Sequence, residues 1–145
     1  MAATNQVGVV RAALKSALAT RLATTTVRSF EPGPDDIGPQ SLWIGDARGR
    51  QDWDSQSTMD DQFDLSVIGF IIKDGDGDTV AASAEDAALL LMAQVEDYLS
   101  DSETIDGTCL IAHLTDYEIA NTAAPGQRRC TITMTVNVRL ELIPT

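Results

Sequence analysis

The most regular pattern of hydrophobic and polar positions lies near the end of the chain, over residues 129–142. Every second position is apolar, and the positions between are polar or charged. Successive side chains of a β-strand point to opposite faces, whereas a helix would scatter this pattern around its circumference. The run therefore predicts one long strand with an apolar face and a polar face. The apolar set is Cys130, Ile132, Met134, Val136, Val138, Leu140 and Leu142, and the polar set is Thr131, Thr133, Thr135, Asn137, Arg139 and Glu141.

Two segments show the spacing of three and four residues that is typical of amphipathic helices. Residues 6–23 are expected to form the first helix, with Asn5 as its N-cap. Ser83 is the expected N-cap of the second helix, where Glu85 and Asp86 suit the positive end of the helix dipole. The apolar stripes are Val7, Val10, Leu14, Ala17, Leu18 and Leu22 in the first helix, and Ala87, Leu90, Leu91, Val95, Tyr98 and Leu99 in the second.

Three further strands are predicted, over residues 41–44, 62–73 and 108–119. The second of them becomes apolar on both sides from Ile68 to Ile72, which indicates cover on both faces at that end. A loop over residues 121–127 would join the strand 108–119 to the last strand as a hairpin. The predicted fold class is therefore α+β, a mostly antiparallel sheet of about four strands with two helices packed on it, in the order α-β-β-α-β-β. Residues 1–145 are expected to form a single domain.

The polar stretch of residues 45–61 has no periodicity, and it is interpreted as a long loop. Such loops in compact domains are usually functional or disordered. Trp53 lies between two aspartates, and Arg48 and Arg50 precede it. A single tryptophan of this kind is compatible with ordinary loop packing. Because Trp and Arg are enriched at interface hot spots, Arg48, Arg50 and Trp53 are also candidates for a partner interface.

The composition is that of a globular protein, with 145 residues and 43% hydrophobic content. No apolar run approaches the roughly 20 residues needed to span a membrane. No signal peptide is visible, so intracellular synthesis is expected. Cys109 and Cys130 both fall within strand patterns and are interpreted as reduced core residues, with a cross-strand disulfide as the alternative.

The net charge of −12 is unevenly distributed along the sequence. Residues 1–30 contain four basic residues and no acidic one, whereas residues 35–106 contain 18 acidic residues against three basic ones, a balance of −15. Solubility alone would account for a negative surface. The balance disfavours a protein that grips duplex DNA, because such affinity comes mostly from Lys and Arg.

Candidate chemistry is sparse. Asp74, Asp76, Asp78 and Glu85 have the spacing of a calcium-binding EF-hand loop, but Thr79 stands where the sharp turn needs Gly and a strand precedes the motif. A solvated acidic turn is therefore the preferred interpretation. His113 is the single histidine, and no nucleophile elbow, dinucleotide fingerprint or phosphate loop is present. We expect no catalytic residue, no metal and no cofactor, and hence no enzyme.

The order of elements resembles the tail terminator family of long-tailed (siphovirus-type) bacteriophages. The resemblance is carried by the strand 63–72, by residues 81–88 (Ala-Ala-Ser-Ala-Glu-Asp-Ala-Ala), by the helix through residues 95–99 and by the two long strands that end at Leu142. Residues 10–14 (Val-Arg-Ala-Ala-Leu) and 41–45 (Ser-Leu-Trp-Ile-Gly) also fit. It covers most of the chain and contains no catalytic signature, and the stretch 45–61 matches no family motif.

The resemblance implies a structural virion protein, a hexameric homo-oligomeric ring that caps the head-proximal end of the tail tube. Such a ring ends tube polymerisation and joins the tail to the neck, with genomic DNA passing through its bore without specific binding. The implied partners are other copies of the chain, a tail tube protein and a neck protein. The implied location is the tail–neck junction of the virion, after assembly in the host cytoplasm, with no membrane involved. Two alternatives stay open: a head–tail connector of the neck, and a calcium- or ligand-binding α+β module.

Overall fold

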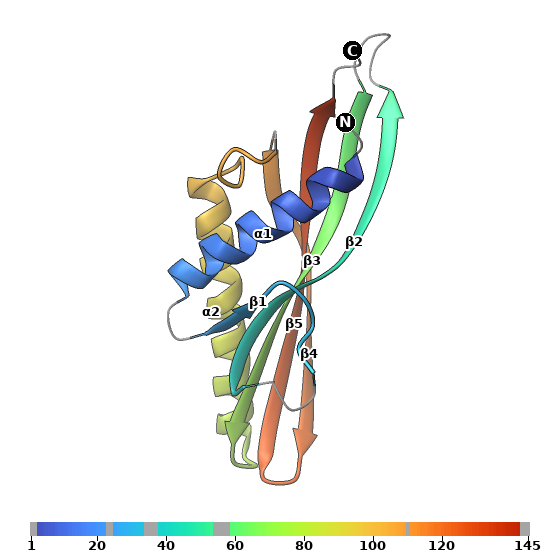
Figure 1. Cartoon of the computed structure of the whole chain (residues 1–145). Coiled ribbons are helices and arrows are strands. Elements are labelled where there is room, and N and C mark those ends of the chain that lie inside the picture. The colour runs from blue at the N-terminus through green and yellow to red at the C-terminus, as the bar shows by residue number, and fades with distance from the viewer. Residues whose placement is uncertain (1–2, 23–24, 34–37, 54–58, 110, 143–145) are drawn as a thin grey trace.

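The computed structural model describes residues 3–22, 25–33, 38–53, 59–109 and 111–142 (Figure 1). Within these ranges the chain forms two helices and one five-stranded sheet. In chain order the elements are α1 (Ala3–Arg21), β1 (Thr26–Arg28), β2 (Gln40–Trp53), β3 (Met59–Asp74), α2 (Asp78–Asp101), β4 (Ile111–Ala124) and β5 (Gln127–Leu142).

The strands lie in the order β1-β2-β3-β5-β4, so β5 is inside the sheet and β1 and β4 are its two edges. β1 pairs with β2 in parallel, and every other pair is antiparallel. The α+β class and the long final strand are confirmed. The predicted number of about four strands was wrong, because β1 adds a fifth strand before the first predicted one. Three residues are too few for an alternating pattern, so this strand left no signal in the sequence.

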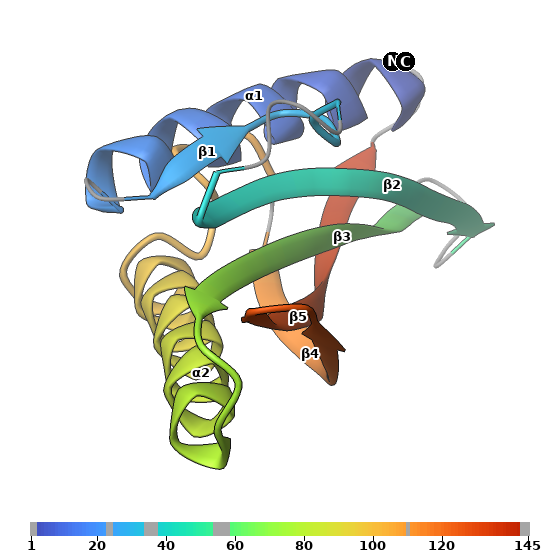
Figure 2. The same ribbon diagram turned by 90° about the horizontal axis from the view of Figure 1, so that it is seen from below.

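One face of the sheet carries the hydrophobic core. Cys130, Ile132, Met134, Val136, Val138 and Leu140 of β5 are all buried there, as the alternation predicts. Both helices cover this face: α1 contributes Val10, Leu14 and Leu18, and α2 contributes Leu91 and Val95. Figure 2 shows α1 lying along β1 and β2, with α2 beside β3, β5 and β4. We call this the covered face.

Neither helix of the described residues covers the opposite face, and we call it the helix-free face. Thr131, Thr133, Thr135, Asn137 and Arg139 of β5 lie on it at intermediate exposure. Ile68, Phe70 and Ile72 of β3 share this face and are only partly buried. The predicted burial of both faces of β3 was therefore wrong at this end. Trp43 of β2 is buried on this side, where its ring lies 6.5 Å from that of Phe70.

Both helices begin earlier than the sequence suggested. α1 begins at Ala3, so Asn5 lies inside the helix, and α2 begins at Asp78 after an N-cap at Gly77, so Ser83 is an exposed helical residue. The buried stripe of α2 is Ala84, Ala88, Leu91, Val95, Tyr98 and Leu99. Leu90, which was expected in that stripe, is 61% exposed. The alanines allow close approach to the sheet, where a Cβ on Gly69 would lie 3.2 Å from the Leu91 side chain.

The stretch 45–61 is not a long loop, because β2 continues to Trp53 and β3 begins at Met59. Residues 54–58 lie outside the described part. A bulge between Ile44 and Ala47 shifts the register, after which the pairing runs without interruption to Trp53 opposite Met59. Residues 46–49 of β2 are all exposed, although the β3 residues opposite them include buried ones. Burial therefore imposes no period of two on residues 46–49 in this distal half of the hairpin. It extends beyond the end of α1 in both views (Figures 1 and 2).

The β4–β5 hairpin is also longer than predicted. β4 runs to Ala124, and only Pro125 and Gly126 separate it from β5. Gly126 has a φ of 71°, a left-handed conformation that suits glycine in a tight turn. The residues expected in a loop, 121–124, are therefore paired strand residues.

Candidate functional site

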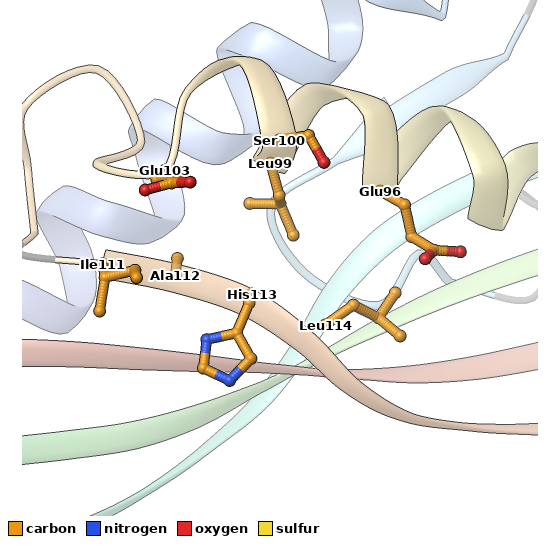
Figure 3. A pocket seen from close by; sticks show the side chains of 8 residues that line it. All are labelled: Glu96, Leu99, Ser100, Glu103, Ile111, Ala112, His113 and Leu114. Atoms are coloured by element: carbon orange, nitrogen blue, oxygen red, sulfur yellow. The ribbon is translucent and has the colours of Figure 1, made fainter.

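A hollow of about 220 Å³ lies between the C-terminal part of α2 and the start of β4. Leu99 and Ala112 form its apolar floor, and Glu96 and Glu103 lie at its rim (Figure 3). His113 points away from α2, toward the other side of the strand (Figure 3). The hollow is thus an apolar depression with acidic walls, and it contains no pairing of a nucleophile with a base.

His113 belongs instead to a row of polar residues that crosses the helix-free face. The pairing register places Arg48, Asp64, Asn137 and His113 side by side on β2, β3, β5 and β4. The Asn137 amide Nδ2 donates a hydrogen bond of 2.9 Å to Oδ1 of Asp64. This bond satisfies two partly buried polar groups. The bond between Asn137 and Asp64 is therefore a cross-strand contact that stabilises the sheet, and the row itself contains no hydroxyl or thiol nucleophile.

The acidic turn after β3 is used to hold the neighbouring hairpin. Oδ1 of Asp76 accepts a 3.1 Å hydrogen bond from the backbone N–H of Gly126, and the Arg128 guanidinium donates to the Asp76 carbonyl. Glu85 accepts a 3.2 Å bond from the Asn121 amide. Two of the four acids with EF-hand spacing, Asp76 and Glu85, therefore bind separate protein partners. Among the described residues, no three His, Cys, Asp or Glu side chains come together as a metal site would need.

The structure places the three predicted interface residues on the distal half of β2. Arg48 is exposed and lines a polar hollow with Gln62, Asp64 and Asn137. Arg50 pairs with Gln62, and Trp53 pairs with Met59 at the end of the strand. The side chains of Arg50 and Trp53 lie outside what the structure describes. Their role in an interface stays a prediction, now attached to a strand instead of a loop.

Arg11 has a structural role that the sequence did not reveal. Its Nη1 donates 2.7 Å hydrogen bonds to the backbone carbonyls of Ser29 and Ile44, and its guanidinium lies 4.5 Å from the centre of the Phe30 ring. Burial lowers the pKa of Arg11, and the nearby carboxylate of Asp46 opposes this shift. Arg11 thus ties α1 to the β1–β2 connection and to the start of the β2 bulge. In the sequence it lies off the apolar stripe of the helix, where a solvent-exposed arginine is the usual expectation.

The two cysteines are free, as predicted: Cys130 is buried and Cys109 is partly buried. Burial raises the pKa of the Cys109 thiol to about 11, and the pKa of Cys130 is also raised, first by burial and then by the charge of Glu85. A nucleophilic cysteine needs a lowered pKa. For both thiols the pKa is shifted in the opposite direction.

The negative charge is concentrated in one segment of the chain. Residues 74–127 contain 12 acidic residues and no lysine or arginine, and the rest of the chain contains ten of each sign. This segment includes α2, which packs on β3, β5 and β4, and the edge strand β4 itself. The wider acidic segment of residues 35–106 does not form one surface, because it also includes β2 and β3.

Comparisons with known proteins give a match at the level of structure. No family model and no curated protein matches the sequence. Among solved structures 28 chains match, including a chain described as "Virion of native gene transfer agent (GTA) particle". It is 15% identical, the match covers 84% of both chains, and the TM-score is 0.52. At this identity the likeness concerns the fold. In the described residues, neither helix is long and apolar enough to cross a membrane.

Proposed function

We propose that this chain is a non-catalytic structural protein of a virion of the tailed-phage type. The observation that carries the proposal is the shared fold, because the likeness to a chain of a gene transfer agent virion covers 84% of each chain. The absence of a nucleophile–base pair in the described hollows is compatible with it. The hydrogen bonds that Asp76 and Glu85 accept within the fold are also compatible with a structural protein.

The more specific part of the proposal is a tail terminator. The chain would form a hexameric ring at the head-proximal end of the tail tube, end tube polymerisation and contact a neck protein. The support is the resemblance in element order together with a pair of chemically different sheet edges, which a head-to-tail ring requires. The acidic segment 74–127 would disfavour adhesion of DNA phosphate where it borders the bore.

A head–tail connector of the neck is the second candidate, because the shared virion fold supports it equally. The two functions differ in the partner that the ring contacts. A terminator binds the end of a tail tube, whereas a connector binds the protein complex at the portal. Neither candidate requires a cofactor or a metal.

Light scattering after gel filtration, over a range of concentrations, tests for a ring, and a discrete hexamer is the expected result. The test of function adds the chain to a polymerising tail tube protein from the same particle and measures tube lengths by electron microscopy. A terminator shortens the tubes and is found at one end. Tubes of unchanged length with no bound chain would exclude the terminator, and binding to the portal complex alone would establish the connector.

A further inference from the structure

The two edges of the sheet differ in charge: the α2–β4 edge carries only acidic charges, whereas the β1–β2 edge carries arginines together with the exposed acids Glu31 and Asp46. We define the α2–β4 edge by Glu96, Glu103 and Tyr117, and the β1–β2 edge by Arg28, Phe30 and Arg48. They lie on opposite sides of the sheet, because β1 and β4 are its outermost strands and the distal half of β2 extends beyond β1. Because the two edges lie on opposite sides of one molecule, the β1–β2 edge of one copy can contact the α2–β4 edge of the next, and each copy can make both contacts at the same time.

Each edge exposes an aromatic side chain beside its charges. Phe30 is 67% exposed and lines a hollow with Trp43 and Ile68 that also contains Glu31 and Asp46. Tyr117 is 55% exposed, and the exposed acids Asp116 and Glu118 lie at the same edge strand but on its other face. An exposed aromatic residue with a rim of charged groups is the composition that protein interfaces favour at their centres.

The charged groups that define these edges form no ion pair or hydrogen bond among the described residues. Arg21 is paired with Asp101 at 2.7 Å, and Arg128 is bonded to the Asp76 carbonyl. Within the described residues, Arg28 and Arg48 have no hydrogen-bonding or ion-pair partner, and the carboxylates of Glu96 and Glu103 have none either. Two exposed cations on one edge therefore face solvent, as do two carboxylates on the other.

We propose that the β1–β2 edge of one copy docks against the α2–β4 edge of the next copy. The inference rests on the proposed function, because it assigns the contact that would close the ring. The hollow between Glu96 and Glu103 takes an arginine side chain: the aliphatic stem lies on Leu99 and Ala112, and the guanidinium meets one of the two carboxylates at its rim. Arg48, on the projecting part of β2, is the arginine that we assign to this hollow. Arg28 and Phe30 then face the acidic surface around Tyr117.

The experiment uses charge reversal on each edge separately. Variant one carries Arg28→Glu and Arg48→Glu, and variant two carries Glu96→Lys and Glu103→Lys. Each variant places like charges on the residues that meet at the proposed contact, so each is expected to lose the ring and remain monomeric. In an equimolar mixture of the two variants, opposite charges meet wherever a copy of one variant contacts a copy of the other. The mixture is therefore expected to restore a ring in which the two variants alternate. A chain that carries all four changes is expected to assemble alone.

The control is Asp86→Lys, on the same helix but about 15 Å from Glu96 along the axis, which should assemble as the wild type does. Circular dichroism melts show that the variants remain folded. Raising the salt from about 50 mM to about 500 mM should weaken the wild-type ring, since exposed charge pairs are screened.

Rings that form equally well in both charge-reversed variants, or a mixture that stays monomeric, would overturn the proposed docking while leaving the virion function intact. A wild-type chain that is monomeric at every concentration and at low salt would also overturn it. Failure of the proposed function would look different: rings respond to charge reversal as expected, but the chain binds neither the tail tube nor the portal complex.

Discussion

The two faces of the sheet are made by the same strands but depend on different interactions. On the covered face, alternate residues of β5 are fully buried under two helices, and hydrophobic burial stabilises them. On the helix-free face, threonines and a ladder of polar residues are partly exposed, and main-chain pairing with modest cross-strand contacts holds them. The comparison teaches that stability is concentrated on one face. The opposite face and the sheet edges are left available for other molecules.

The largest effect is expected from a charge on the covered face. Val136→Asp places an uncompensated carboxylate where Val136 is completely buried. The cost of such a change, about 3–5 kcal/mol or more, is comparable with the whole stability of a small domain. We expect insoluble or unfolded protein, judged by circular dichroism.

The matched control is Thr131→Asp, on the helix-free face of the same strand, which should stay folded. A soluble Val136→Asp variant with a cooperative melt would contradict the division between the faces. Loss of folding in both variants would show that the helix-free face is as intolerant of charge as the core.

A smaller loss is expected where α2 touches the sheet. In Gly69→Ala the new Cβ would lie 2.9 Å from Cγ2 of Ile132 and 3.2 Å from Cδ1 of Leu91. Both neighbours belong to the packed core, so overpacking should lower the free energy of unfolding by about 1–3 kcal/mol. Urea denaturation measures the change. Gly49→Ala, in the distal half of β2, meets only contacts of 3.4 Å and should be tolerated. Equal stability of both variants would show that α2 can shift without cost.

The sequence revealed the covered face well because burial imposes a pattern on it. The alternation of β5 and the helical stripe with Leu14 and Leu18 are visible in the sequence because the apolar side chains there must all point toward the core. In the distal half of the β2–β3 hairpin, residues 46–49 of β2 are all exposed, so they carry no period of two, and the sequence did not reveal their pairing with β3. The hydrogen bonds of Arg11 to Ser29 and Ile44 depend on how the β1–β2 connection is placed in the fold. The spacing of residues within α1 carries no information about that placement.

Arg11 connects the covered face to the β1–β2 edge, and its loss should have a moderate effect. Arg11→Ala leaves the carbonyls of Ser29 and Ile44 without their donor, which should lower the free energy of unfolding by about 1–3 kcal/mol. Arg21→Ala is the comparison, because its ion pair with Asp101 is exposed and should contribute less than about 1 kcal/mol. Chemical denaturation of both variants gives the difference. An Arg11 variant no less stable than the Arg21 variant would mean that water replaces the guanidinium at both carbonyls.

The smallest effect on stability, and a distinct effect on assembly, is expected at the end of β2. Trp53 lies in the distal half of the hairpin, which extends beyond α1, so Trp53→Ala should change the free energy of unfolding by no more than about 0.5 kcal/mol. If Trp53 is an interface anchor, the same variant should require a higher concentration to form the ring in light scattering. Val9→Ala truncates an exposed apolar side chain on α1 and should leave assembly unchanged. A Trp53 variant that melts earlier but assembles normally would assign this tryptophan to packing within the hairpin. The projecting strands would then contribute to the stability of the fold and not to assembly, contrary to the division between the core and these strands.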